Sequence, residues 1–176
     1  MAYLSHLSLT NFRNLGIDAL RLPVTFEHLA GPAPNYTLDT NHEVFGLIDD
    51  AISWAASNNM KLIIDMHHGT NTLTDANYLT ELPRLEAIWA QIIARYSDLD
   101  PERYFFEIYN EPFDISNDNF RVVAQALVDV IRAAGAEHSI IVGASGFNSA
   151  GELLSFPPLD DPDIIYTFHF YEPFAF

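Results

Sequence analysis

The sequence predicts an α/β fold with a parallel sheet. Short apolar runs alternate along the chain with longer amphipathic segments, which is the pattern of strands connected by helices in successive βα units. The 176 residues include 49% hydrophobic and 18% charged residues, as expected for a folded domain. Polar residues follow several apolar runs directly, where a parallel sheet places its functional groups. We therefore expect a single domain over residues 1–176.

The first half of the chain contains two of these units. A helical pattern at 5–14 precedes the first expected strand, 19–24 (ALRLPV). Residues 43–58 carry apolar side chains at helical spacing opposite a polar face, and the next apolar run is 61–66 (KLIIDM). The helical face that we expect to be buried consists of Val44, Leu47, Ile48, Ile52 and Ala55.

The second half repeats this alternation. A helix is expected at 81–96, with Pro83 near its start, where a helix tolerates proline, and a strand follows at 104–109 (YFFEIY). A further helical pattern at 120–134 ends before Gly135, a residue type that is common just after helices. The remaining expected strands are 139–143 (SIIVG) and 163–170 (DIIYTFHF).

Two architectures fit these strands, an incomplete TIM barrel and a flavodoxin-like doubly wound sheet. The doubly wound sheet usually has a glycine-rich phosphate-binding loop after its first strand. Here the loop after Val24 reads TFEHLAGPAPNYTLD, and its aromatic, acidic and proline residues suit an uncharged polyol better than a phosphate. A complete (β/α)8 barrel needs eight units in about 250 residues, so we expect an incomplete barrel of about five parallel βα units.

Composition excludes several classes of function. The chain has 24 acidic and 8 basic residues and a formal charge of -16, which repels nucleic acid and anionic membranes. No apolar run is long enough to span a membrane, and the start of the chain has no signal-peptide pattern. The lack of cysteine excludes disulfides and thiol chemistry but leaves the compartment unknown.

The strongest chemical signal is Asn110-Glu111-Pro112, directly after a strand that we expect to be buried. The carboxyl end of a parallel strand is where such folds place their sites, and the proline ends the strand. Glu107 falls on the same face if the strand stays regular, and a buried carboxylate needs a partner. Arg21, inside an apolar run, is the expected partner. The alternatives are a solvated loop glutamate and a surface arginine on an edge strand.

Two other strand ends deliver polar groups to the same rim. Period-two alternation puts Asp65 and His67 on one face at the end of the second run. The last run ends with His169 and Tyr171, again two polar rings on one face. A metal site formed by His67, His68 and His169 is a weaker alternative, because no metal-binding spacing such as HExxH is present. We expect no metal and no cofactor.

Four motifs together resemble the successive strand motifs of glycoside hydrolase family 5, in clan A, whose members include endoglucanases, mannanases and related β-glycanases. They are RLPVTFE, LIIDMHHG, FEIYNEP and FHFYEP, in this order and at this spacing. The resemblance covers nearly the whole chain. It implies a truncated TIM-barrel catalytic domain with strands two to six, lacking the first strand and strands seven and eight. It also implies hydrolysis of β-1,4-glucan, as by a cellulase or endo-β-1,4-glucanase, and a secreted parent enzyme.

The resemblance implies roles for individual residues as well. Glu111 matches the general acid/base, and Asn110 matches the asparagine that binds the sugar 2-hydroxyl. Arg21 matches the arginine of the second barrel strand. The residues that line the cleft and orient the carboxylates are matched by His67, His169 and Tyr171. Phe147, in GASGFNS, stands where the family often has a tryptophan platform for sugar stacking.

The implied mechanism is a retaining double displacement. Glu111 would protonate the glycosidic oxygen while a second carboxylate, about 5 to 5.5 Å away, attacks the anomeric carbon, and Glu111 would then activate water. In the family the nucleophile belongs to the seventh strand, which we expect to be absent from this chain. Glu172 is a weak substitute, because alternation points it away from His169 and Tyr171.

The choice is therefore between a β-glycanase and an inactive fragment that binds oligosaccharide or only self-associates. An open piece of a barrel has two unpaired edges, so we expect a homo-oligomer formed through them. Trp54 and Trp89 fall on helical patterns and are expected to pack in the core rather than stack on sugar. The run 159–163 (LDDPD) is expected to be a solvated loop.

Overall fold

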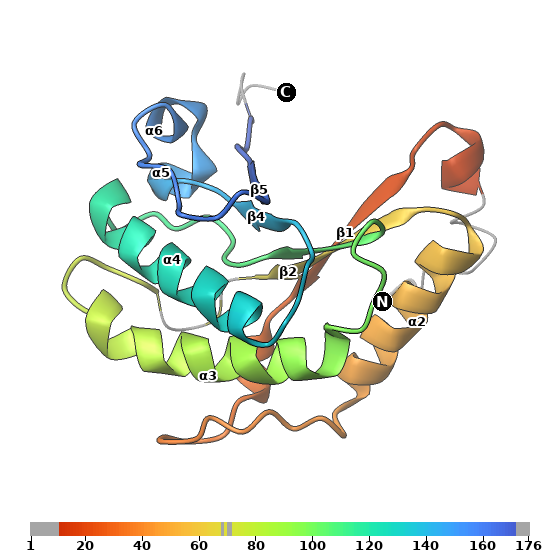
Figure 1. Cartoon of the computed structure of the whole chain (residues 1–176), viewed down its shortest axis with the longest axis horizontal. Helices are drawn as coiled ribbons and strands as arrows, with labels where there is room; N and C mark the ends of the chain where they lie inside the picture. The colour runs from red at the N-terminus through yellow and green to blue at the C-terminus, as the bar shows by residue number, and fades with distance from the viewer. Residues whose placement is uncertain (1–10, 68, 70–71, 172–176) are drawn as a thin grey trace.

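The computed structural model describes residues 11–67, 69 and 72–171, which form an α/β structure around one sheet. The strand order is β1-β2-β3-β4-β5, and each neighbouring pair is parallel (Figure 1). Because each strand lies beside the preceding one, every βα unit adds to the same growing edge. This is the progression of a barrel and not of a doubly wound sheet, whose strand order reverses. The predicted fold class is confirmed.

The strands become shorter along the chain. Their bounds are β1 Ala19–Val24, β2 Lys61–Met66, β3 Tyr104–Glu107, β4 Ile140–Val142 and β5 Ile164–Tyr166. The first two match the predicted ranges, and the other three are shorter than predicted. Since β4 has only 3 residues, β5 pairs with it over 3 positions and stops where β4 stops. The predicted strand at 163–170 is therefore wrong beyond Tyr166.

Helices connect the strands. They are η1 Phe26–Leu29, α2 Glu43–Ser57, α3 Tyr78–Tyr96, α4 Asn117–Ala133, α5 Ser145–Asn148 and α6 Ala150–Leu153. Helix α3 begins earlier than predicted, so Pro83 lies inside it and not at its start. Helix α4 also begins earlier than predicted. The Ser116 hydroxyl accepts a hydrogen bond from the backbone N–H of Asn119 and so caps the start of the helix.

The helix predicted at 5–14 is described only in part. Residues 11–14 are helical, and the rest of that prediction lies outside the described residues. Within the described ranges, no helix is long and apolar enough to cross a membrane.

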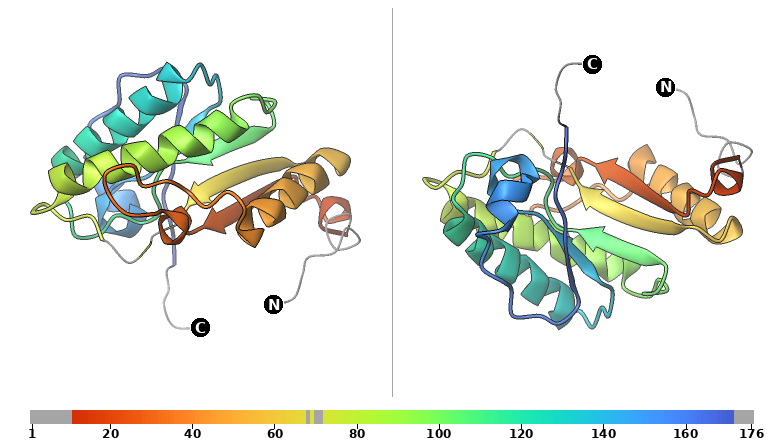
Figure 2. Two further views of the ribbon diagram at one scale, coloured as in Figure 1. Left: turned by 90° about the horizontal axis from the view of Figure 1, so that it is seen from below. Right: turned by 90° about the horizontal axis from the view of Figure 1, so that it is seen from above.

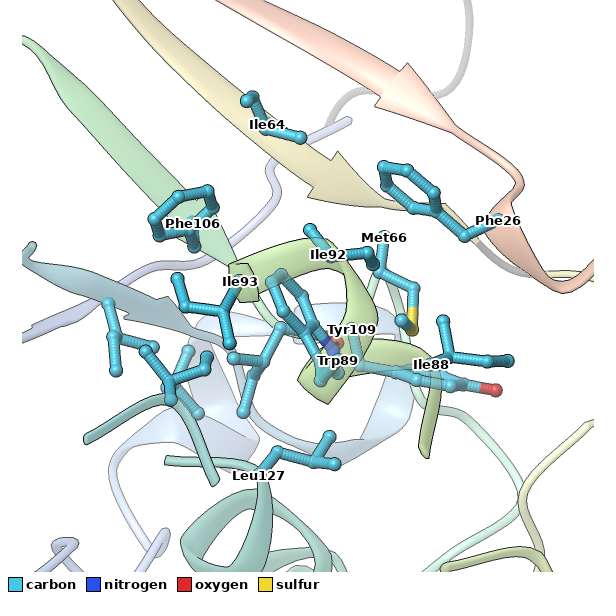
Figure 3. Packing of buried hydrophobic residues seen from close by; sticks show 14 of the residues in the cluster. Phe26, Ile64, Met66, Ile88, Trp89, Ile92, Ile93, Phe106, Tyr109 and Leu127 are labelled. Atoms are coloured by element: carbon cyan, nitrogen blue, oxygen red, sulfur yellow. Dashed lines mark hydrogen bonds between the residues drawn. The ribbon is translucent and has the colours of Figure 1, made fainter. Parts of the chain in front are cut away.

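The main core lies between the sheet and helices α3 and α4, which lie side by side (Figures 1 and 2). Figure 3 shows Ile64 of β2 and Phe106 of β3 facing Trp89 and Ile92 of α3, and all four are fully buried. The Trp89 indole N–H donates to the Ile108 carbonyl at 3.1 Å, so burial leaves no unpaired donor on this ring. The predicted packing role of Trp89 is confirmed.

Helix α2 packs most of its predicted apolar face against the core, since Ile48 and Ala55 are buried and Val44 and Ile52 are partly buried against it. Its buried residues are Phe45, Ile48, Ala51 and Ala55. Leu47, which we predicted to be buried, is 38% exposed and lines a hollow of about 480 Å³ between α2 and β1. Because β1 is an edge strand, no further βα unit among the described residues covers this side of the helix. Trp54, on the same helix, is half-buried.

Candidate active site

Three neighbouring strands bring Arg21, Asp65 and Glu107 together near the carboxyl end of the sheet. The register of β2 and β3 sets Asp65 beside Glu107. From β1, Arg21 donates to both oxygens of Glu107, through Nε at 2.6 Å and Nη2 at 2.8 Å. Its Nη2 also lies 3.0 Å from Asp65 Oδ2. Arg21 is thus the predicted partner of the buried Glu107, and the alternative of a free surface arginine is wrong.

The two carboxyl groups of this cluster are almost completely buried, with Asp65 0% and Glu107 2% exposed. Burial raises the pKa of Asp65 to about 8, and the charge of Glu107 adds to this effect, while Arg21 opposes it. The hydrogen bond to Glu107 is the main cause that raises the pKa of Arg21. Arg21 and Glu107 thus form a close ion pair at 2.6 Å, with Asp65 beside them.

His67 extends this cluster toward solvent. Its Nδ1 lies 2.8 Å from Asp65 Oδ2, which confirms that the two side chains share a face, and its side chain is 32% exposed. Burial is the main cause that lowers the pKa of His67, and the nearby Arg21 lowers it further. Burial therefore disfavours the charged forms of both His67 and Asp65.

The chain leaves the strand conformation between Glu107 and Glu111. Asn110 is 1% exposed. Its backbone N–H donates to the Met66 carbonyl at 3.0 Å, and its side-chain Oδ1 accepts from Arg21 at 2.8 Å. Glu111 has a φ of 47°, a left-handed conformation that is uncommon outside glycine. The regular strand that would align Glu107 with Glu111 ends at Glu107, so the two carboxylates have different partners.

Glu111 is held by two rings from the segment after β5. The Nδ1 atom of His169 lies 2.6 Å from Glu111 Oε1, and the Tyr171 hydroxyl donates to the same oxygen at 3.3 Å. Because an ionised carboxylate can only accept, His169 Nδ1 is the donor whenever Glu111 is charged. The prediction that His169 and Tyr171 share a face is confirmed.

Two hollows flank Glu111, and Phe147 lines both. The larger, of about 590 Å³, extends past Phe147 to His169 and Tyr171, and the smaller, of about 140 Å³, lies beside Phe113. Phe113 and Phe147 are 48% and 56% exposed and stack face to face with ring centroids 4.9 Å apart. Sequence reasoning missed Phe113, although its place directly after Asn110-Glu111-Pro112 was the signal available.

Some predicted residues fall outside this geometry. Glu172, considered as a substitute nucleophile, and His68, considered as a metal ligand, lie outside the described residues. Within the part of the chain that the structure describes, no three or more histidine, aspartate, glutamate or cysteine side chains form a group that could hold a metal ion.

The chain is similar to known proteins over nearly its whole length. The family model of cellulase (glycosyl hydrolase family 5) matches residues 5–176. Endoglucanase 3 of Fibrobacter succinogenes is 32% identical over 178 residues, which cover 92% of this chain and 26% of that protein. Endoglucanase C of Acetivibrio thermocellus is 29% identical, with 92% and 48% covered. The chain thus spans half or less of the length of these two curated relatives.

Solved structures share the fold. The cellulose synthase subunit Z of Clostridioides difficile superimposes with a TM-score of 0.86 at 25% identity, covering 98% of this chain and 56% of that one. An endoglucanase of the hyperthermophile Thermotoga maritima superimposes with a TM-score of 0.87 at 24% identity, covering 98% and 55%. The described strands and helices thus correspond to about half of each of these folds.

Proposed function

Because this chain belongs to glycosyl hydrolase family 5, we propose that it carries the acid/base part of a retaining β-glucanase site whose substrate is β-1,4-linked glucan. Glu111 is the general acid/base. The observation that carries this proposal is the pair of contacts on Glu111 Oε1, from His169 at 2.6 Å and Tyr171 at 3.3 Å. These contacts hold one carboxyl group between two hollows at the carboxyl end of a parallel sheet.

In the first step, Glu111 donates its proton to the glycosidic oxygen while a second carboxylate attacks the anomeric carbon. The bond to the leaving sugar breaks, and a covalent glycosyl–enzyme ester forms. In the second step, the ionised Glu111 takes a proton from water, and the water oxygen attacks the anomeric carbon and displaces the carboxylate. His169 stabilises the ionised Glu111 between the two steps because its Nδ1–H donates to the charged oxygen.

The surrounding residues support this chemistry. Arg21 orients Asn110 through the 2.8 Å hydrogen bond, and we assign the Asn110 amide to the sugar 2-hydroxyl. We assign to His67, at the end of β2, a place in the lining of the substrate cleft, with its side chain 32% exposed. The exposed face of Phe147 offers an apolar surface for the C–H face of a sugar ring.

The nucleophile is not among the described residues that line the two hollows, because Glu111 is the only carboxylate there. Asp65 and Glu107 are buried and held by Arg21, so neither can reach an anomeric carbon. We propose that the second carboxylate comes from a segment outside the described residues or from another chain.

Hydrolysis tests the proposal directly. Soluble β-1,4-glucan is incubated with the wild-type chain, with Glu111→Gln and with Glu102→Gln, and new reducing ends are measured. Glu102 is the matched control because it is exposed and precedes β3 at the opposite end of the sheet. We expect activity in the wild type and the control, and a rate lower by about 100-fold or more in Glu111→Gln. A wild-type rate no higher than that of Glu111→Gln would contradict hydrolysis by this chain.

The unpaired edges of the sheet favour a second function, self-association of an inactive chain that at most binds oligosaccharide. Within the described part of the chain, β1 and β5 each pair with one strand. Near the β5 edge, Ile165, Tyr166 and Phe168 are 42%, 38% and 52% exposed. Unpaired edges with apolar side chains pair readily with another chain. Sedimentation velocity at micromolar concentration should therefore detect an oligomer, and a single monomeric species would contradict this function.

A further inference from the structure

The short element α5, which follows β4, departs from ordinary α-helical geometry, because three consecutive residues in it are in the left-handed conformation. The φ angles of Gly146, Phe147 and Asn148 are 61°, 63° and 56°, and we call these residues the left-handed turn. Glycine adopts this conformation readily and asparagine tolerates it, but phenylalanine does so at a cost. Such a conformation persists only where its surroundings hold it, and residues of this kind cluster at functional sites.

The backbone of the left-handed turn contacts both segments that form the Glu111 pair. On one side, the Phe147 N–H donates to the carbonyl of Pro112, the residue after Glu111, at 3.1 Å. On the other side, the Asn148 carbonyl accepts from the His169 N–H at 2.8 Å. One short turn thus connects the backbone beside Glu111 to the backbone of its hydrogen-bond partner.

The aromatic rings make a second connection between the left-handed turn and this segment. The Phe147 ring stacks on Phe113, with an angle of 2° between the ring planes. Since Phe113 follows Pro112, the stacking and the backbone hydrogen bond tie the turn to adjacent residues of the same segment.

Asn148 is fully buried, and its side chain packs against Gly143 at the end of β4. A Cβ atom on residue 143 would collide with the Asn148 amide. Among the described residues, neither Oδ1 nor Nδ2 of Asn148 has a hydrogen-bond partner. The value of asparagine at this position is therefore its tolerance of the left-handed backbone rather than a side-chain hydrogen bond.

We propose that the left-handed turn sets the position of Glu111 relative to His169, and that Asn148 is a positioning residue. The carbonyl of Asn148 holds the His169 backbone, so a change in the φ of Asn148 displaces His169 and lengthens its 2.6 Å contact with Glu111. An effect of this displacement on hydrolysis rests on the proposed function of Glu111, whereas the positioning of His169 by Asn148 does not depend on that function.

Two variants of Asn148 separate backbone conformation from side-chain chemistry. Asn148→Gly and Asn148→Ala both delete the amide, but only glycine readily keeps the left-handed φ. The measurement is the imidazole Nδ1–H resonance of His169 by ¹H–¹⁵N NMR near neutral pH. This resonance is assigned by its disappearance in His169→Gln and by its shift in Glu111→Gln. Thermal unfolding establishes that each variant is folded.

We expect Asn148→Gly to keep the wild-type His169 resonance and Asn148→Ala to shift or lose it. A wild-type resonance in folded Asn148→Ala would overturn the proposal. Loss of the resonance in Asn148→Gly would also overturn it, because the amide would then be the positioning group. If Asn148→Ala does not fold, Gly143→Ala takes its place, because the added Cβ atom would collide with the side-chain amide of Asn148. An unchanged His169 resonance in Gly143→Ala overturns the proposal, and a changed one supports it.

The hydrolysis assay on the same variants keeps this inference distinct from the proposed function. We expect kcat to fall by about 10- to 100-fold in Asn148→Ala and to recover in Asn148→Gly, since a small displacement of a catalytic group has effects of this size. An inactive wild-type chain that shows the expected resonances would contradict hydrolysis but support positioning. An active chain whose kcat is the same in Asn148→Ala as in the wild type would contradict positioning alone.

Discussion

Replacing Arg21 with methionine tests the cluster at the base of the site. The change removes two hydrogen bonds to Glu107, one to Asn110, and the 3.0 Å contact with Asp65. Methionine keeps a long apolar side chain at this position, so the main loss is the charge. Glu107, which is 2% exposed, then remains buried without its cation.

We expect the free energy of unfolding of Arg21→Met to fall by about 3 kcal/mol at pH 7. Removal of one partner from a buried ion pair costs about 3–5 kcal/mol, because it leaves an uncompensated charge. The Arg21 side chain is 31% exposed, and screening by water puts the expected loss at the lower end of that range. The matched control is Arg121→Met. Its partner Asp160 is 84% exposed, so the expected loss is below about 1 kcal/mol.

Urea unfolding followed by tryptophan fluorescence measures both changes. The double variant Arg21→Met/Glu107→Gln should be more stable than Arg21→Met, because it no longer buries the Glu107 carboxylate without a cation. The decrease in the free energy of unfolding caused by Arg21→Met should also become smaller at acidic pH, where a buried carboxyl group can take up a proton. Equal losses in Arg21→Met and Arg121→Met, or a double variant less stable than Arg21→Met, would refute the reasoning.

Three further predictions concern buried titratable groups and the stacked rings. The pKa of Asp65 is about 8 in the folded chain and has its ordinary value of 3.8 in the unfolded chain. As the pH rises, the Asp65 carboxyl group therefore loses its proton in the unfolded chain before it does so in the folded chain. The stability of the wild type should therefore fall by up to about 1.4 kcal/mol per pH unit between these values. Asp65→Asn should flatten that slope in urea midpoints measured from about pH 4 to pH 8. His138 has the opposite effect: burial lowers its pKa, so protonation below 6.5 favours the unfolded chain. His138→Phe, beside Phe106 at 4.8 Å, should make unfolding less sensitive to acid, and an unchanged acid midpoint would contradict this. Phe147→Ala should weaken calorimetric binding of a β-1,4-linked gluco-oligosaccharide by about 2- to 10-fold, and an unchanged affinity would argue against sugar stacking on this ring.

Much of the site could be predicted from local residue patterns. Arg21 stands alone as a charge within an apolar run, and a buried Glu107 requires a cation, so their pairing followed from the cost of burying either group alone. His169 and Tyr171 are two residues apart, and their common orientation followed from the alternation of an extended chain. Their shared contact with Glu111 is a relation between distant segments, which only the fold supplies.

Element ends were predicted less well, because the partner of an element decides where it stops. Strand β5 ends with β4, although aromatic residues continue to alternate with polar ones in its sequence as far as Phe170. Helix α3 runs through Pro83, because burial of its apolar face outweighs the local effect of one proline. Leu47 fits the helical period of α2, but it is 38% exposed because no further βα unit among the described residues covers that side of the helix.

By itself the sequence determined the parallel α/β class and the order of the units, since period and strand-end residues are local properties of the chain, and it singled out Glu111 as the candidate acid/base. The tertiary structure alone decided the complete burial that raises the pKa of Asp65 and the left-handed turn beside Glu111. Both depend on contacts between segments far apart in sequence, such as the Asn148 carbonyl with the His169 amide. Local propensity favours neither a left-handed phenylalanine nor a buried aspartate, so packing of the whole fold has to stabilise them.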